Sequence, residues 1–262
     1  MKRTWQRWTE EEIELLKIHW KSSTMKELLQ QFPNRKYNSL MTKAQQIGIK
    51  SEAQRKRKGS LKYLDQLISN SCYWWGFIIA DGHLTKKGEL VIGLDIKDIA
   101  HLEKLANHLN CQVHKRKSLN SYTNKVSESC NLFIQDKNFG IKWLSLLNIN
   151  SPKTYTPPDL SIFLNKENLI NFFIGMVDGD GCIWESKSWL NLRIELHFNW
   201  LSTLQLISDK LKEFYDVDCK VKITKRNTAK LEINTKKDLQ ILKSYINGLD
   251  FLERKWTKLD TL

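Results

Sequence analysis

The sequence predicts an α+β protein with two related halves, preceded by a small all-α domain. First, Trp74-Trp-Gly-Phe-Ile-Ile-Ala-Asp-Gly82 is repeated in altered form as Phe173-Ile-Gly-Met-Val-Asp-Gly-Asp-Gly181, 99 residues further on. A repeat of that period suggests two half-domains. Second, apolar and polar residues alternate after each motif, as in half-buried strands. Third, apolar residues recur with helical spacing in the first 50 residues.

The composition indicates a polyanionic partner. The chain has 42 Lys and Arg against 29 Asp and Glu, which gives a formal net charge of +13 and a pI near 9.4. Such an excess favours binding to nucleic acid. With 262 residues and 41% hydrophobic content, the chain can bury a full core, so general disorder is excluded.

Cysteine usage and the absence of long apolar runs indicate a soluble protein that is not secreted. The five cysteines are scattered and include no C-x-x-C pair, so neither a disulfide framework nor a thiolate zinc site is indicated. No signal peptide is evident, and no apolar run approaches the ~18 residues of a membrane helix. We expect a reducing intracellular compartment: the cytoplasm of a bacterium or of a phage-infected cell, or an organelle.

Charge and proline mark the domain boundaries. The first 60 residues carry 14 basic and 6 acidic side chains and end in the basic run Arg55-Lys-Arg-Lys-Gly-Ser60, which is typical of a linker. Three of the four prolines lie in residues 151–159 and interrupt regular structure there. The predicted divisions are an amino-terminal module, a basic linker, a first half, an inter-half linker and a second half: residues 1–50, 51–62, 63–150, 151–166 and 167–262.

Three short helices are predicted in the amino-terminal module. Thr9 caps an acidic first turn that is followed by apolar residues through Trp20. A second helix is predicted over Thr24 to Phe32, and a third follows the Pro33-Asn34-Arg35 turn and ends at Gly48.

The third helix is the candidate recognition helix. It turns Leu40, Ala44 and Ile47 inward, and its outward side chains can bond base edges or phosphates: Asn38, Ser39, Thr42, Lys43, Gln45 and Gln46. The module resembles Myb/SANT-like and related helix-turn-helix modules, on Trp8-Thr-Glu-Glu-Glu and the later Trp20. The adjoining linker has four basic residues, which favour DNA as the partner of the module: Arg55, Lys56, Arg57 and Lys58. A plain helical bundle or a protein-binding module is the alternative.

The two motif helices have small residues four apart, Gly76 with Ala80 and Gly175 with Gly179. These residues share one helix face and allow two backbones to approach closely. If the helices pair in parallel, Asp81 and Asp180 emerge side by side. Two such carboxylates are stable when they share a proton or bind cations, and hard ions such as Mg²⁺ prefer oxygen ligands. Metal-assisted phosphodiester hydrolysis is the chemistry that follows.

Both motifs resemble those of the LAGLIDADG homing endonucleases, in the single-chain form that carries two halves, over residues 61–262. The resemblance implies a metal site formed by Asp81, Asp180, Gly82 and Gly181, which holds Mg²⁺ or Mn²⁺, as two or more ions, at the paired acids. Ile79 departs from the motif where the first Asp is expected. A monomer is implied that cuts both strands of a long, asymmetric DNA target and leaves short 3′ overhangs.

The same resemblance implies αββαββα half-domains that form a saddle of antiparallel sheets. It also places a basic residue just after the last helix of each half, near the metal-bound water and scissile phosphate. Lys153 and Lys255 occupy those positions. A lysine there can stabilise developing phosphate charge.

Polar faces of the alternating strands are candidates for major-groove contacts. In the second half, Lys220, Lys222 and Arg226 are expected on one face of a strand, opposed by Val221 and Ile223. The full set of candidate sheet residues is His114, Arg116, Asn131, Gln135, Asn191, Arg193, Lys220, Lys222, Arg226, Lys230 and Asn234. A solvated sheet face without a ligand remains the alternative for each of them.

Other nuclease chemistries find no support in the sequence. The six histidines form no H-x-H or H-N-H arrangement, and no phosphate-binding loop is present. The alternative to a nuclease is a binding protein on the same scaffold: a maturase that binds intron RNA, or a DNA-binding regulator.

Overall fold

The computed structural model describes most of the chain, and its contacts form two compact units, residues 1–58 and residues 59–262. Each unit has its own hydrophobic core. The described residues are 7–20, 23, 25–49, 59–85, 87–119, 126–149, 152–186 and 189–261.

Unit 1 is a bundle of α1 (Glu10–His19), α2 (Met25–Gln31) and α3 (Tyr37–Gln46). The predicted start of α1 is a capping box, in which the Glu12 amide donates to Thr9 Oγ1 and the Thr9 amide donates to Glu12 Oε2, both at 3.1 Å. Gly48 follows α3 with a φ of +74°. The all-α fold class predicted for this region is confirmed.

The core of unit 1 comes from all three helices: Leu16, Trp20, Leu28, Phe32, Leu40 and Ala44. An ion pair ties the start of α1 to the turn after α2, because Arg35 donates to both Glu12 carboxylate oxygens at 2.8 and 2.6 Å. The same guanidinium lies 4.4 Å from the Trp8 ring centroid. Ile18, which the sequence places among the apolar residues of α1, is 65% exposed.

Unit 2 contains two antiparallel four-stranded sheets with the same strand order, β1-β2-β4-β3 and β5-β6-β8-β7. Each half follows the predicted succession of helix, two strands, helix, two strands and helix, so the α+β fold class is confirmed. The first half consists of α5 (Ser69–Asp81), β1 (Gly82–Leu84), β2 (Glu89–Asp95), α6 (Ile99–His108), β3 (Val113–Leu119), β4 (Val126–Gln135) and α7 (Lys137–Leu146).

The second half repeats this order. Its elements are α8 (Leu169–Asp180), β5 (Gly181–Ser186), β6 (Trp189–His197), α9 (Leu201–Tyr215), β7 (Lys220–Ile223), β8 (Thr228–Ile233), α10 (Lys236–Tyr245) and α11 (Glu253–Trp256). Short 3₁₀ helices join the elements: η1 (Leu61–Gln66), η2 (Ile96–Asp98), η3 (Ser161–Phe163), η4 (Phe198–Trp200) and η5 (Thr257–Thr261).

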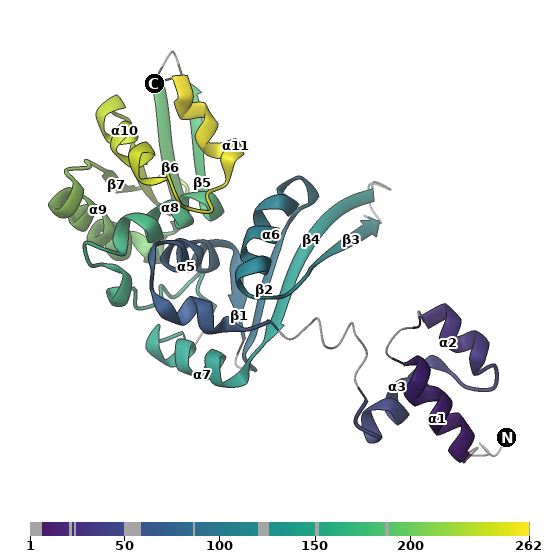
Figure 1. The fold of residues 1–262 in the computed structure, drawn as a ribbon. Helices are drawn as coiled ribbons and strands as arrows, with labels where there is room; N and C mark the ends of the chain where they lie inside the picture. The colour runs from purple at the N-terminus through teal and green to yellow at the C-terminus, as the bar shows by residue number, and fades with distance from the viewer. Residues whose placement is uncertain are drawn as a thin grey trace. The chain divides into compact units, whose positions relative to one another are not determined.

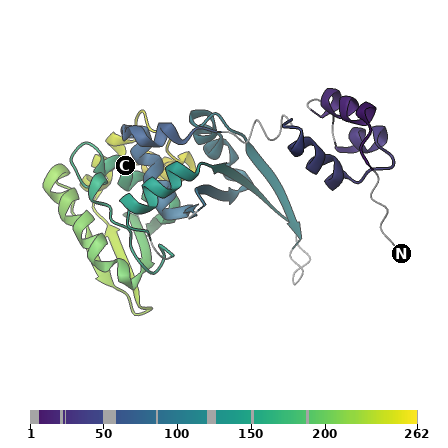
Figure 2. The same cartoon turned by 90° about the horizontal axis from the view of Figure 1, so that it is seen from below.

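The sheets repeat even in register. Gly82 pairs with Ile92 and Gly181 pairs with Ile194, so each motif glycine begins the first strand of its sheet at the same place. Helix α6 packs on the first sheet and α9 on the second (Figure 1). Strands β3 and β4 extend away from the helices, and the polar ends of both strands are exposed (Figure 2).

Helices α5 and α8 pack together at the centre of unit 2, with backbone against backbone. A Cβ atom on Gly76 would lie 1.9 Å from the Phe172 carbonyl oxygen, and one on Gly175 would lie 1.9 Å from the Tyr73 carbonyl oxygen. One on Gly179 would lie 2.3 Å from the Cβ of Ala80. The contacts advance together along both helices, so the pair is parallel, as the small residues predict.

The first residues of unit 2 are packed against its core. The Ser60 amide donates to the Leu109 carbonyl at 2.7 Å, and Leu61 is fully buried. A Cβ on Gly59 would lie 2.6 Å from Ile134 Cδ1. Residues 59–62, which the sequence assigned to the linker, are therefore part of unit 2, because two apolar side chains of η1 complete its core. No helix in the described part of the chain has the length and apolar content needed to cross a bilayer.

Substitution of a helix-pair glycine tests this packing. We expect Gly76→Ala to lower the free energy of unfolding by about 1–3 kcal/mol, because the new Cβ meets a backbone carbonyl that no rotamer change can move. Urea denaturation measures the loss. Gly93→Ala is the control, since its Cβ would meet only the end of the Asn131 side chain, and it should change stability by less than about 0.5 kcal/mol. Equal midpoints for the two variants would contradict the close packing.

Candidate active site

The two motif acids are the last residues of the central helices. Asp81 ends α5 and Asp180 ends α8, and both side chains are exposed. The next residue in each case is a glycine in extended conformation whose amide donates back to the helix, Gly82 to Ile78 and Gly181 to Val177.

Only glycine fits at these two turns. A Cβ on Gly82 would lie 2.8 Å from the Ile78 carbonyl oxygen, and one on Gly181 would lie 2.5 Å from the Val177 carbonyl oxygen. A glycine therefore lets each chain turn from helix to strand directly after the acid. The turn fixes the acid at the helix end.

The two carboxylates interact with each other and with both candidate lysines. Partial loss of hydration raises the pKa of Asp81 and of Asp180, and the negative charge of Asp81 raises the pKa of Asp180 further. Lys153 and Lys255 act in the opposite direction on both acids. Loss of hydration also lowers the pKa of each lysine. Four ionisable groups, two from each half, therefore share one region of the surface.

This donor set fits a hard divalent cation. Both side chains offer only oxygen, and they stand at the carboxyl ends of two parallel helices, where the helix dipoles add negative potential. A bound cation would offset the repulsion between the carboxylates. The described residues contain no group of three or more His, Cys, Asp or Glu arranged for a metal ion. The acid pair would need carbonyl, water or phosphate oxygens to complete the coordination of a cation.

Lys153 lies beyond α7 and reaches the carboxyl end of α5. Its ammonium donates to the carbonyl oxygens of Ile79 and Ala80, the latter at 2.5 Å. Its backbone is held from the other half, because Trp200 Nε1 donates to the Lys153 and Thr154 carbonyls at 3.1 and 3.2 Å. The side chain thus caps the helix that ends in Asp81.

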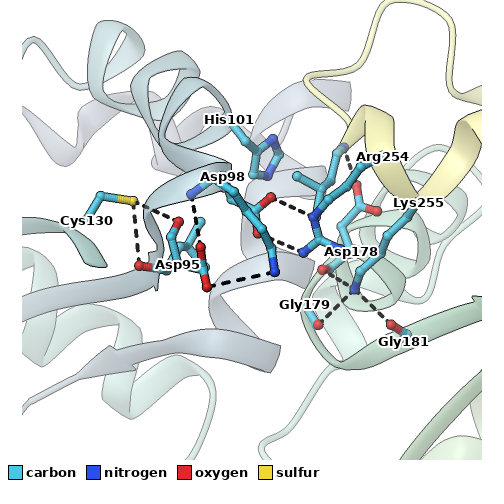
Figure 3. A network of polar contacts seen from close by, with 12 residues as sticks. Asp95, Asp98, His101, Cys130, Asp178, Gly179, Gly181, Arg254 and Lys255 are labelled. Carbon is cyan, nitrogen blue, oxygen red and sulfur yellow. Dashed lines mark hydrogen bonds and ion pairs between the residues drawn. The ribbon is translucent and has the colours of Figure 1, made fainter. Parts of the chain in front are cut away.

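Lys255 lies on α11 and reaches the carboxyl end of α8. Its ammonium donates to four carbonyl oxygens, those of Val177 at 2.9 Å, Asp178 at 2.5 Å, Gly179 at 3.0 Å and Gly181 at 2.8 Å (Figure 3). The Gly181 carbonyl, which belongs to a predicted metal-binding position, therefore already accepts a hydrogen bond. Each lysine caps the helix of its own half.

A third acid, Asp178 of the second motif, is buried beneath this surface. Its carboxylate accepts from Tyr73 Oη at 2.7 Å, from the Leu252 amide at 2.8 Å and from Trp256 Nε1 at 2.6 Å. Loss of hydration raises the pKa of Asp178 to about 6, against the effect of all three donors. Asp178 thereby joins α5, α8 and the segment around α11.

His101 extends this network into the first half. Its Nε2 lies 3.1 Å from Tyr73 Oη, and the Tyr73 proton already points to Asp178, so the imidazole donates through Nε2. Its Nδ1 is buried and has no hydrogen-bond partner among the described residues. Burial lowers the pKa of His101 to about 4, which keeps the ring neutral.

An ion pair between the halves lies beside Lys255. Arg254 donates to both carboxylate oxygens of Asp98, at 2.6 and 2.7 Å, and Asp98 is 6% exposed (Figure 3). Neither Asp98 nor its contact with Arg254 was predicted from the sequence. The two residues are 156 positions apart, and no local pattern in one sequence connects them.

A cavity of about 560 Å³ opens beside the first motif. Asp81 and Lys153 are its charged lining residues, and the rest of the lining is largely apolar: Trp75, Ile78, Ile79, Ala80, Gly82, His83, Leu84, Thr85, Leu144, Ile149, Pro152 and Thr154.

The candidate DNA contacts of the first sheet lie on strands β3 and β4. His114, Arg116 and Gln135 are exposed, and Asn131 is half-buried opposite His114. Gly93, on β2, pairs with Asn131 of β4. Because Gly93 has no side chain, it does not cover the side-chain amide of Asn131.

On the second sheet, Asn191, Arg193, Lys220, Lys222 and Lys230 share the polar face that the register predicts. Acids are interspersed among them. Lys230 donates to Glu232 at 2.7 Å with both side chains largely covered, and Arg193 lies 3.7 Å from Glu195.

Two further candidates of the second half lie off the strands. Arg226 was expected on the face of β7, but it lies in the turn before β8, because Thr224 and Thr228 close a hairpin there with Asn227 at a φ of +59°. Asn234 follows β8, and its Oδ1 is buried with no partner among the described residues.

In unit 1, α3 exposes Asn38, Thr42 and Gln46, while Ser39 and Lys43 are half-buried. The Lys43 ammonium lies 6.0 Å from the Trp8 ring centroid. The basic run Arg55 to Lys58 lies outside the described residues.

Solved structures resemble this chain, although no protein-family model matches it and a search of curated proteins found no match. The homing endonuclease I-WcaI, bound to its DNA recognition sequence, superposes with a TM-score of 0.55 at 13% identity, over 78% of this chain and 91% of that one. The N-terminal LAGLIDADG domain of DUF199/WhiA gives 0.44 at 20% identity, over 75% and 90%.

I-SmaMI, bound to an uncleaved DNA target in the presence of calcium ions, gives a TM-score of 0.45 at 15% identity, over 71% and 89% of the two chains. At such identities, the likeness to I-WcaI shows a common fold. Unit 2 therefore has the two-sheet fold of a LAGLIDADG homing endonuclease, as the motifs predict.

The Asp178 and His101 network makes a testable prediction about pH. Asp178 has a folded pKa near 6, above its usual 3.8, so its contribution to stability is present at low pH and is lost as the pH rises through 6. His101 has a folded pKa near 4, below its usual 6.5, so its contribution is present above pH 6.5 and is lost as the pH falls. In the wild type the two contributions oppose each other between pH 4 and 6.5.

Single variants should reveal each contribution. Relative to wild type, His101→Gln should lose stability by about 2–3 kcal/mol as the pH rises from 4 to 6.5, and Asp178→Asn should gain about as much. Urea denaturation across this pH range, with each variant subtracted from wild type, measures the slopes. Slopes of the same sign in both variants would contradict the assignment.

Proposed function

We propose that this chain is a site-specific, double-strand DNA endonuclease that hydrolyses phosphodiesters with a divalent cation held at Asp81 and Asp180. The target is long and asymmetric, because two unequal sheets would read it, and the protein acts as a monomer, because one chain carries both halves. Short 3′ overhangs are the expected product.

One observation supports this proposal most strongly. Two parallel helices in backbone contact end on Asp81 and Asp180, the charge of Asp81 raises the pKa of Asp180, and two lysines act on both acids. A structural role does not require two exposed carboxylates to meet at a positively charged surface. Cation binding next to a phosphate backbone does require such a pair of carboxylates.

Within this proposal, the residues divide the work. Asp81 and Asp180 would hold Mg²⁺ or Mn²⁺, which when bound supplies an activated water and stabilises the attacking and leaving oxygens. The two motif glycines keep both acids at the helix ends. A lysine beside the two acids would donate to a phosphate oxygen as negative charge develops on that oxygen.

The polar faces of the two sheets would follow the major groove on either side of the scissile phosphates. Arg116, Gln135 and Arg193 are side chains of the kind that bond base edges there. The acids Glu195 and Glu232 would orient the basic residues beside them. Sequence specificity would then come from the sheets, and phosphate contacts would set the register.

The first test is cleavage of a randomised-target DNA library with and without Mg²⁺. We expect metal-dependent cutting at one long site, and we expect it to fall by at least about 1,000-fold in the Asp81→Asn, Asp180→Asn double variant, because a cation loses both charged ligands. Binding to the selected site, measured without metal by gel shift, should change by less than about tenfold.

Asp209→Asn is the matched control, since Asp209 is an exposed acid on α9, away from the helix ends. It should cut like wild type. Tight DNA binding without cutting by the wild-type protein would instead indicate a DNA-binding regulator. Preferential binding to structured RNA that survives the double substitution would indicate a maturase.

We further propose that unit 1 is a helix-turn-helix module that lengthens the target, with α3 as its recognition helix. Deletion of residues 1–58 should weaken binding to a long target by about 10-fold to 100-fold while the cleavage rate at saturation stays within about twofold, because the module would add contacts in one further major groove. Gel shift and single-turnover kinetics measure the two quantities. On a short target that covers only the saddle, both proteins should bind equally, and a truncated protein that binds the long target as tightly as the full chain would exclude this role.

A further inference from the structure

Lys153 and Lys255 occupy equivalent places in the two halves, but their ammonium groups have different surroundings. An ammonium group has three N–H donors. Lys255 is surrounded by four carbonyl oxygens within 3.0 Å, all from the last turn of α8 and the residue after it. Every donor of Lys255 is therefore used within the protein.

Lys153 retains a donor. Among the described residues, its ammonium bonds two carbonyl oxygens, those of Ile79 and Ala80, which leaves one N–H. Lys153 also lines the 560 Å³ cavity beside Asp81, whereas Lys255 does not. The negative charges of Asp180 and Asp81 act on Lys153 from the same region.

The difference follows from one departure between the two motifs. Asp178 stands three residues after Gly175, and Ile79 stands three residues after Gly76. The Asp178 carboxylate accepts from the Leu252 amide and from Trp256, which draws the segment that carries Lys255 onto the end of α8. The Ile79 side chain is buried and has no polar atom, so it makes no contact equivalent to those by which the Asp178 carboxylate holds the Lys255 segment.

The residue before each lysine also makes the Lys255 segment more firmly held than the Lys153 segment. Arg254 is locked to the buried Asp98 of the first half by two hydrogen bonds (Figure 3). The corresponding residue, Pro152, has no side-chain donor. The Lys153 segment is held instead through its backbone, by Trp200. The Lys255 segment is thus held by both Asp178 and Asp98, whereas the Lys153 segment is held by Trp200.

From these contacts we infer that the two lysines have different functions: Lys153 donates its remaining N–H to the scissile phosphate, whereas Lys255 is a structural cap of α8. This inference rests on the proposed endonuclease function and adds to it a strand preference. The strand whose phosphate meets Lys153 is cut first, and the other strand is cut without help from a lysine.

The experiment compares Lys153→Met with Lys255→Met on a supercoiled plasmid that carries the site selected from the randomised library, with each strand end-labelled. Wild type should accumulate nicked circles before linear product. Lys153→Met should slow the fast strand by about 100-fold and leave the slow strand unchanged. Lys255→Met should keep the order of strand cleavage and the ratio of the two strand rates, because Lys255 donates to neither phosphate.

Urea denaturation supplies a readout that does not depend on cleavage. Lys255→Met should lower the midpoint clearly, because four carbonyl oxygens lose their donor, and Lys153→Met should lower it much less. If Lys255→Met fails to fold, that result agrees with the cap, and the strand-resolved rates of Lys153→Met then decide the inference.

The inference is overturned if both variants slow both strands equally, or if Lys153→Met cuts like wild type. It is also overturned if the two midpoints fall to the same extent. A wild-type protein that cuts no target in the library would refute the proposed function, and the comparison of midpoints would still show whether Lys255 contributes more to stability than Lys153 does.

Discussion

The backbone contact between α5 and α8 is the constraint on which the rest of unit 2 depends. Four small residues allow it, and at Gly76 and Gly175 even one added methyl group would overlap a carbonyl oxygen. Because the helices run parallel, both end at the same level. Each sheet then begins directly after its helix, so the position of the sheets, the two acids and the two capping lysines all follow from this single contact.

Much of this arrangement could be predicted because it depends on residues that are close together in the sequence. The glycine spacing, the acid that ends each helix and the alternation of apolar and polar residues in β6 and β8 depend on neighbours within one turn or one strand. The same holds for the Thr9 and Glu12 capping box. A repeated motif then doubles each local inference, since what holds for the first copy applies to the second.

The remainder depends on contacts that the sequence does not record. The ion pair of Asp98 with Arg254 and the hydrogen bonds of Asp178 join segments from opposite halves, and Gly59 and Ser60 contact Leu109 and Ile134, far along the chain. Arg226 was misplaced because alternation continues in the letters after the strand has already turned. The substitution of Ile79 for an acid was visible in the sequence, but its effect on a lysine 74 residues away was not.

The Asp98 and Arg254 contact also has a consequence for synthesis of the chain. Arg254 leaves the ribosome 156 residues after Asp98, a delay on the order of ten seconds at typical elongation rates. During that interval the first half lacks the partner of its buried acid, and α8 lacks its cap. The proposed catalytic centre would therefore stay incomplete in a nascent chain until the second half has been made.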